Sequence, residues 1–256
     1  MTRGIILAGG TGSRLGPLSK VTNKHLLPVG PVPMIFHPLS EMLENGITDI
    51  CVVSGLFHLG SMVELLGSGS RYSCRFTYKV QDAAGGIAEA LMLCRDFAGG
   101  DDIAVILGDN IFADVLNLHL PQGGAHAKFF LKKVEDPHRF GVAEVDHMKR
   151  LVDVEEKPEN PKSDLAVTGA YVYSSAIWQA CGRIGRSPRG ELEISDANKE
   201  MIRNGIVDTC ELGGWWSDAG TQDSYRRANR EVWDSLCPQL MARITNMARA
   251  CRGEAE

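Results

Sequence analysis

The sequence predicts an α/β fold whose sheet is mostly parallel and covered by helices on both faces. Short apolar runs alternate with segments whose apolar residues repeat at helical spacing, and glycine or polar residues follow several of the runs. In the first half, the strand-like segments are 5–8, 49–53, 76–80 and 103–107, and the helix-like segments are 35–43, 61–66 and 87–97.

Each element of the first half has a local reason. Segments 5–8, 49–53 and 103–107 are short apolar runs, typical of strands buried on both faces, whereas 76–80 alternates apolar and polar residues. Helix 35–43 repeats apolar residues at helical spacing, and Asn45-Gly46 supplies its stop. Ligands of parallel sheets bind at the carboxyl ends of strands, where 9–14 and 108–110 lie.

The second half is richer in strands. Turns at Asp136-Pro137 and between Pro158 and Pro161 separate the strand candidates. The predicted strands are 128–134, 141–145, 151–155 and 166–173, and the predicted helices are 193–203 and 222–232. No repeat, low-complexity stretch or flexible linker interrupts them, so a single domain spanning 1–234 is the simplest interpretation, with a tail at 235–256 that carries no motif.

Composition excludes several classes of protein. The chain has 256 residues and a net charge of −5, which argues against a dedicated nucleic-acid binder. Seven cysteines without a close pair suggest neither a disulfide framework nor a zinc site and fit a reducing cytosol. No signal peptide or membrane span is apparent, so we expect a cytoplasmic protein without nucleic-acid or membrane partners.

A glycine-rich turn after the first strand is the most informative segment. Glycines let backbone N–H groups approach an anion, and Arg14 and Lys24 can balance phosphate charge. A tight turn with an arginine salt bridge is the alternative for Arg14, and a solvated surface position is the alternative for Lys24. Lys24, however, lies in an apolar segment where an unpaired charge is costly. The stretch matches neither a Walker A loop nor a dinucleotide fingerprint.

Two aspartates are candidate magnesium ligands. Asp109 ends an apolar strand, and Asp218 follows Trp215-Trp216-Ser217. Magnesium commonly takes one or two carboxylates, and phosphate oxygens and water complete its shell. The alternatives are that Asp109 caps a turn and that Asp218 caps the following helix.

Three further residues could contact a ligand. Glu156 can accept sugar hydroxyls and Lys157 can meet a sugar phosphate, because Pro158 fixes the turn that holds them; solvated charges are the alternative. Gln81 could read a nucleobase edge, although a polar strand terminus is the better explanation when it is taken alone. None of the histidines forms a triad-like motif, so no histidine general base is assigned.

These motifs together resemble the glucose-1-phosphate thymidylyltransferases, in their short form, within the sugar nucleotidyltransferase family. The resemblance extends from Gly4 to about Asn229. It rests on segments 7–15, 24–28, 33–35, 108–112, 140–142, 155–158, 166–169, 189–194 and 218–221. It implies a Rossmann-like fold with an inserted sugar-binding subdomain, the nucleotide-binding part being about 1–112 and the sugar-binding part about 113–220.

The resemblance also implies roles for individual residues. Arg14, Lys24 and Lys157 would be catalytic, and Mg²⁺ would be held by Asp109 and Asp218. The nucleotide would contact Leu7, Ala8, Gly9, Gly10, Gly12, Arg14, Lys24, Gln81, Gly86 and Asp109. The sugar phosphate would contact Asn110, Gly141, Glu156, Lys157 and Val167.

The reaction implied by the resemblance joins dTTP and glucose 1-phosphate into dTDP-glucose and releases pyrophosphate. The sugar phosphate is already an anionic nucleophile, so no general base is required and charge neutralisation with alignment suffices. A homo-oligomer, dimer or tetramer, is expected by kinship. UTP or another hexose 1-phosphate, and a silent sugar-nucleotide-binding regulator, remain alternatives. Departures from the commonest pattern at Gly16, His25 and Asp82 place base selectivity in question.

Overall fold

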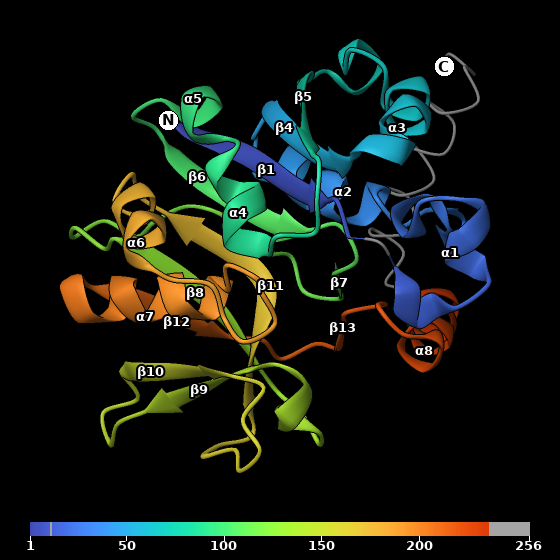
Figure 1. Cartoon of the computed structure of the whole chain (residues 1–256). Coiled ribbons are helices and arrows are strands. Elements are labelled where there is room, and N and C mark those ends of the chain that lie inside the picture. Colours follow the sequence, from blue (N-terminus) through green and yellow to red (C-terminus); the bar gives the residue numbers. More distant parts are fainter. Residues whose placement is uncertain (11, 236–256) are drawn as a thin grey trace. The chain divides into compact units, whose positions relative to one another are not determined.

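The computed structural model describes residues 1–10 and 12–235 in two compact units (Figure 1). Unit 1 comprises Met1–Arg3, Gly85–Val105 and Leu118–Gly213, and unit 2 comprises Gly4–Ala84, Ile106–Asn117 and the chain from Gly214. The predicted tail lies, apart from its first residue, outside the described residues. The predicted division into a nucleotide-binding and a sugar-binding part stays a prediction.

Three parallel strands form the centre of unit 2. They are β1 (Thr2–Ala8), β4 (Asp49–Gly55) and β5 (Arg75–Gln81), with β4 in the middle. The apolar residues of β1 and β4 are buried, as expected of strands covered on both faces. Ala8 pairs with Ser54, and Gly55 pairs with Gln81. The carboxyl ends of all three strands therefore meet at one edge, where the glycine-rich turn begins.

Helices α2 (Phe36–Glu44) and α3 (Leu59–Leu66) follow the predicted pattern in unit 2. Helix α2 ends at Asn45, and Gly46 adopts a φ of 68°, which explains why Asn-Gly stops the helix there. Helix α3 packs against β4 and β5. The same unit contains the short elements α1 (Leu18–Val21), β2 (Pro28–Val29), β3 (Val32–Pro33), β7 (Ile111–Phe112) and β13 (Trp216–Ser217).

Helix α8 (Gln222–Ser235) packs on the β2–β3 hairpin of unit 2. A β-carbon on Gly30 would lie 2.2 Å from Cγ1 of Val232, so the turn of the hairpin needs a glycine to meet the helix. The Tyr225 hydroxyl donates to the Pro28 carbonyl at 2.7 Å and adds a polar tie. The cluster that seals this contact contains Val29, Met34, Ile111, Ala219, Ala228 and Val232.

Unit 1 is built on a largely antiparallel arrangement. Strand β11 (Leu165–Tyr173) pairs antiparallel with β8 (Ala127–Lys133) and β9 (Gly141–Val145), and β9 pairs with β10 (Leu151–Glu156). Strand β12 (Val207–Glu211) adds to β8 in parallel. Helix α7 (Ile194–Asn204) packs against β10 and against α6 (Ile177–Arg183).

One of the remaining elements departs from the predicted pattern. The predicted helix 87–97 is divided into α4 (Ile87–Met92) and α5 (Arg95–Ala98). The break occurs because the Cys94 N–H donates to the Leu91 carbonyl at 2.9 Å, a tighter bond than an α-helix makes. Strand β6 (Asp102–Leu107) lies where it was expected.

The structure confirms the α/β class with a mixed sheet. Within the part of the chain that the structure describes, no helix combines the length and apolarity needed to cross a bilayer.

Candidate functional site

The glycine-rich turn lies directly after β1 in unit 2, and side chains from elsewhere in the sequence pack against its glycines. A β-carbon on Gly9 would lie 2.9 Å from Oε1 of Gln81, and one on Gly10 would lie 3.5 Å from Nζ of Lys24. Gly12 has a φ of 66°, and a β-carbon there would lie 3.1 Å from Cβ of Lys24. Unit 2 thus brings Gln81 and Lys24 to the turn, as the predicted nucleotide site requires.

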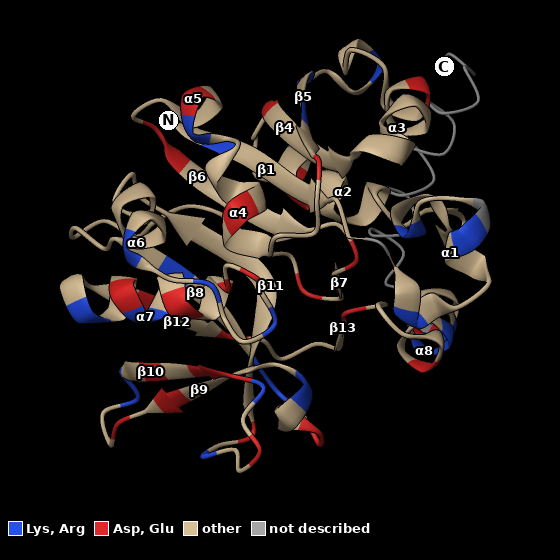
Figure 2. Ribbon diagram, in the orientation of Figure 1, with Lys and Arg blue, Asp and Glu red and all other residues tan. Residues whose placement is uncertain are grey.

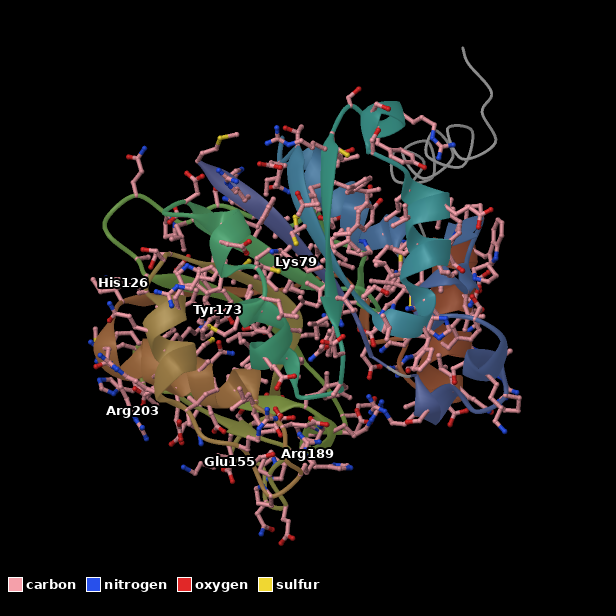
Figure 3. All side chains as sticks on the ribbon, turned by 45° about the horizontal axis from the view of Figure 1, so that its top comes forward. Lys79, His126, Glu155, Tyr173, Arg189 and Arg203 are labelled. Carbon is pink, nitrogen blue, oxygen red and sulfur yellow. The ribbon has the colours of Figure 1, made fainter. Side chains whose placement is uncertain are left out.

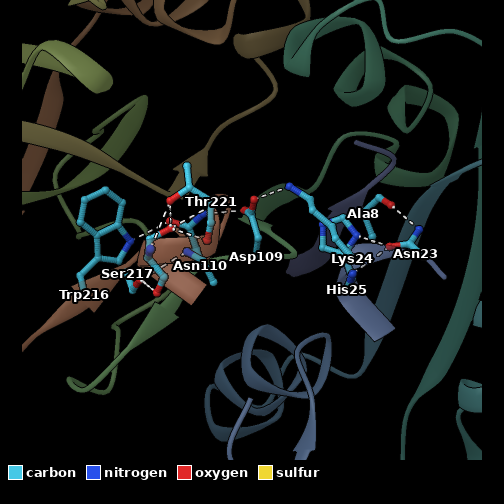
Figure 4. Close-up of polar contacts among 11 residues, drawn as sticks. Ala8, Asn23, Lys24, His25, Asp109, Asn110, Trp216, Ser217 and Thr221 are labelled. Carbon is cyan, nitrogen blue, oxygen red and sulfur yellow. Dashed lines mark hydrogen bonds and ion pairs between the residues drawn. The ribbon is translucent and has the colours of Figure 1, made fainter. Parts of the chain in front are cut away.

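Lys24 forms a buried ion pair with Asp109 in unit 2 (Figure 4). The two side chains are 11% and 12% exposed. Burial raises the pKa of Asp109, but the Lys24 ammonium and other neighbours outweigh it and hold that pKa below its usual value. Asp109 therefore stays ionised, and the alternatives of a surface lysine and of a turn-capping aspartate are not what the structure shows.

His25 anchors the turn that carries Lys24. Asn23 Oδ1 accepts from the His25 backbone N–H at 2.9 Å and lies 2.6 Å from His25 Nδ1, while Asn23 Nδ2 donates to the Ala8 carbonyl. Burial lowers the pKa of His25 to about 3, with the Lys24 charge acting in the same direction. The neutral ring packs tightly on Gly108, where a β-carbon would lie 2.7 Å from Cδ2 of His25.

A two-stranded ladder brings the segment that carries Asp218 next to the segment that carries Asp109. Strands β13 and β7 pair antiparallel, with Trp216 opposite Phe112 and Ser217 opposite Ile111. The next pair in this register would set Asp218 opposite Asn110, beside Asp109. Asn110 accepts from Trp216 Nε1 at 2.7 Å and donates to Asp109 Oδ1 at 3.0 Å (Figure 4). Residues predicted from motifs about a hundred positions apart thus meet in one unit.

Arg14 approaches the same place. A β-carbon on Gly220 would lie 3.4 Å from Oδ2 of Asp109 and 3.5 Å from Nη2 of Arg14. Arg14 makes no hydrogen bond or ion pair with another described residue, so its charge remains available to an anion. Two cations, Arg14 and Lys24, and the carboxylate of Asp109 therefore lie beside glycines that carry no side chain of their own.

Asp218 does not cap α8. Thr221 precedes the helix, its Oγ1 accepts from the Ser224 N–H at 3.2 Å, and the Ser224 hydroxyl accepts from the Thr221 N–H at 3.0 Å. These reciprocal bonds form the cap. Between Asp218 and the cap, Ala219 adopts a φ of 36°, a costly conformation for a residue with a side chain and one often found at functional sites.

The candidate sugar residues lie together in unit 1, at the end of β10. Glu156 accepts from the Ser195 hydroxyl at 2.6 Å, and its Oε1 lies 2.9 Å from Lys157 Nζ and 3.4 Å from Arg189 Nη2. Figure 2 shows acidic residues along β10, and Figure 3 shows Arg189 close to the strand end where Glu155 is labelled. Burial raises the pKa of Glu156, but these donors outweigh it and lower the pKa overall.

The backbone around Glu156 is held by β9. Lys157 has a φ of 44°, and its N–H donates to the Phe140 carbonyl at 2.9 Å. Gly141 pairs with Glu156 in the β9–β10 register and with Val167 in the β9–β11 register. Four of the five predicted sugar residues are thus neighbours, whereas Asn110 belongs to unit 2.

Gly86 belongs to unit 1, although the other predicted nucleotide residues lie in unit 2. It adopts a φ of 105°, and a β-carbon there would lie 2.3 Å from the Leu192 carbonyl oxygen. Glycine is therefore required for this contact between two segments of unit 1. Its contact with a base stays a prediction.

Sequence reasoning missed four side chains at these sites. Asn23, Arg189, Ser195 and Trp216 each bond to a predicted residue or to the strand that carries it. Arg189 and Trp216 occur in quoted motifs but received no role. Ser195 and Asn23 gave no usable signal, because a single serine or asparagine has many ordinary uses.

Comparison with known proteins decides the family. The sequence profile of the family described as Nucleotidyl transferase matches residues 3–235. The chain belongs to this family. It is therefore an enzyme of the nucleotidyltransferase class, and the family resemblance inferred from the motifs is confirmed.

Several relatives of this chain are named glucose-1-phosphate thymidylyltransferase. The glucose-1-phosphate thymidylyltransferase of Neisseria meningitidis serogroup A is 40% identical over 98% of this chain and 88% of that protein. The enzyme of that name from Xanthomonas campestris pv. campestris is 41% identical over 94% of this chain and 86% of its own length.

Solved structures agree with the fold. A Bacillus anthracis crystal structure in complex with a sucrose, assigned provisionally as a glucose-1-phosphate thymidylyltransferase, has 48% identity and a TM-score of 0.84 over 91% of this chain and 96% of its own. A UDP-glucose pyrophosphorylase complexed with UDP-glucose, at 20% identity and a TM-score of 0.78 over 91% of this chain and 99% of its own, shares the fold alone.

Proposed function

We propose that the chain transfers a thymidylyl group from dTTP to glucose 1-phosphate, giving dTDP-glucose and pyrophosphate. The observation that carries the proposal is the gathering of Arg14, Lys24 and Asp109 around the glycine-rich turn at the end of β1. Relatives that are about 40% identical over most of this chain are named glucose-1-phosphate thymidylyltransferase, and these names support the choice of substrates.

The nucleotide half of the reaction is assigned to unit 2. Gly9, Gly10 and Gly12 carry no side chain over their own backbone N–H groups, and Lys24 and Arg14 supply positive charge for the triphosphate. Gln81, which lies beside Gly9, would meet the base through its amide. These residues bind and align the α-phosphate without taking part in covalent chemistry.

Asp109 and Asp218 fit a magnesium ion. The donor set is two hard carboxylates, and among the described residues no cluster of three or more histidine, cysteine or acidic side chains competes as a metal site. The lowered pKa of Asp109 keeps one of these ligands charged. When bound, Mg²⁺ supplies charge neutralisation for the phosphates and the departing pyrophosphate.

The sugar half is assigned to unit 1. Glu156 accepts sugar hydroxyls, Lys157 meets the sugar phosphate, and Gly141 and Val167 flank them on β9 and β11. Arg189 joins this group as a further cation on the evidence of its contact with Glu156.

The reaction balances without an acid or a base. A phosphate oxygen of glucose 1-phosphate forms a bond to the α-phosphorus of dTTP while the bond to the bridging oxygen of pyrophosphate breaks. The nucleophile is already ionised, which agrees with a site that contains cations but only a neutral His25 near the turn. Residues of the chain contribute charge and alignment.

Magnesium-dependent pyrophosphate release tests the proposal. Glucose 1-phosphate is incubated with dTTP, UTP, CTP, GTP or ATP in parallel. We expect the fastest release with dTTP. Release only with another nucleotide would retain the mechanism and change the substrate, and silence with every nucleotide would favour another sugar phosphate or a regulatory protein. A dimeric or tetrameric assembly stays a prediction that sedimentation can measure.

A further inference from the structure

We propose that Ser195 is the positioning residue that sets Glu156 for the sugar, and that residue 141 is a glycine because Ser195 needs the space. The inference rests on the proposed function and assigns a role to a residue that no motif singled out. It also changes the reason for Gly141, whose absent side chain serves the serine rather than the sugar directly.

Ser195 is held in a fixed place. It is the second residue of α7, which packs against β10, and only 3% of its surface is exposed. Its hydroxyl donates to Oε2 of Glu156 at 2.6 Å, a short distance typical of a bond to a charged acceptor. A serine has a single side-chain torsion that carries its oxygen, so little entropy is lost in holding this bond.

The other carboxylate oxygen of Glu156 has more exposed partners. Oε1 lies 2.9 Å from Nζ of Lys157 and 3.4 Å from Nη2 of Arg189, and the side chains of these cations are 39% and 45% exposed. The long side chains of Lys157 and Arg189 can turn toward a phosphate, whereas the buried Ser195 side chain stays beside Glu156. Ser195 therefore remains the donor that fixes the carboxylate plane when Oε1 exchanges a cation for a sugar hydroxyl.

Gly141 leaves room for this arrangement. A β-carbon there would lie 3.0 Å from the Ser195 hydroxyl oxygen, 3.5 Å from Cγ1 of Val154 and 3.6 Å from Oε2 of Glu156. Only the contact with Ser195 is tighter than ordinary van der Waals contact. Gly141 is not among the glycines with positive φ, so its backbone would accept alanine. The glycine is thus explained by the position of one hydroxyl group.

A double-mutant cycle on the full chain tests both statements. Steady-state kinetics are measured for wild type, Ser195→Ala, Gly141→Ala and the double variant, with glucose 1-phosphate and dTTP varied separately. We expect Ser195→Ala to raise the KM for glucose 1-phosphate about tenfold, because a hydrogen bond to a charged group is lost. The KM for dTTP and the kcat should stay within about twofold of wild type, a separation that general loss of structure would not produce.

The cycle should show strong coupling. Gly141→Ala displaces the serine hydroxyl and is expected to raise the same KM, but it should add little once the hydroxyl is gone. Ser163→Ala is the matched control, since it removes a serine of unit 1 that donates to the Ala143 carbonyl at 2.6 Å and does not bond Glu156. Its KM for glucose 1-phosphate should equal that of wild type.

Each other outcome overturns a definite statement. An unchanged KM in Ser195→Ala, with wild type active, would overturn the positioning role alone. Equal increases in both KM values would show general damage and overturn it as well. Additive effects in the double variant would overturn the explanation of Gly141. A wild type that releases no pyrophosphate with any nucleotide would overturn the proposed function and this inference with it.

Discussion

Lys24 and Asp109 neutralise each other in unit 2, although each is assigned to a different part of the ligand. Their side chains are almost completely shielded from solvent. A lysine assigned to a phosphate and a carboxylate assigned to a metal are held together by their own attraction. Ligand binding must therefore replace this ion pair by two new ones, one between Lys24 and the phosphate and one between Asp109 and the metal. The binding free energy of the phosphate then depends on that of the metal.

Replacing Lys24 by glutamine should make the protein less stable without metal and more responsive to Mg²⁺. Leaving Asp109 buried without its counter-charge costs about 3–5 kcal/mol, and a bound cation would supply the missing charge. Thermal unfolding with and without excess Mg²⁺ measures the effect. Lys20→Gln, which changes an exposed lysine of α1, is the control. An equal Mg²⁺-induced shift in Lys24→Gln and wild type would contradict the prediction.

Replacing Asp218 by asparagine should reduce turnover by about 100-fold or more and raise the Mg²⁺ concentration needed for half-maximal rate, because a neutral amide is a poor magnesium ligand. The Thr221–Ser224 cap does not involve its side chain, so α8 should keep its structure. Asp223→Asn, at an exposed position in the first turn of α8, is the matched control. Near-normal rates of Asp218→Asn at limiting Mg²⁺ would remove Asp218 from the metal site.

Much of the fold was predictable because its strands and helices carry local patterns. Helix α2, for example, combines apolar spacing with an Asn-Gly stop, and both features act within a few residues. Strand β12 was missed because its alternation is weak and its residues are only partly buried. It is defined by its parallel pairing with β8 from Val207 to Glu211, a long-range interaction that local sequence does not contain.

In the candidate site, too, some residues could be predicted from the local sequence and others could not. Lys24 and Asp109 could be proposed from charge beside apolar segments and glycines, but their ion pair depends on folding together positions 85 residues apart. Ser195 could not be singled out, because its role arises from the register that sets Gly141 opposite Glu156. The residues that act directly on a ligand carried a motif, whereas those that hold them did not.

Replacing Gln81 by alanine should weaken the choice among bases. Gln81 ends β5 beside Gly9. Its side-chain amide can form hydrogen bonds with the edge of a base. We expect the ratio of kcat/KM for dTTP over the other nucleotides to fall about tenfold, since hydrogen-bonded readout gives strong discrimination. Gln179→Ala, an exposed amide on α6, should leave the ratio unchanged. A constant ratio in Gln81→Ala would exclude base reading by this residue.

Acid should remove the stability that Glu156 contributes. Its pKa in the folded chain lies below the ordinary value of 4.5, because donation from Ser195 and Lys157 outweighs burial. A group with a lowered folded pKa adds stability that is fully present above the unfolded pKa and is lost as the pH falls through the folded one. The free energies of urea unfolding of wild type and Glu156→Gln should therefore differ most near neutral pH, and the difference should shrink below pH 4.5.

Ser195→Ala, which lacks the main donor, should show a smaller acid-dependent change in its free energy of unfolding than wild type. A difference between wild type and Glu156→Gln that grew on acidification would show that burial, rather than these donors, governs the carboxyl group.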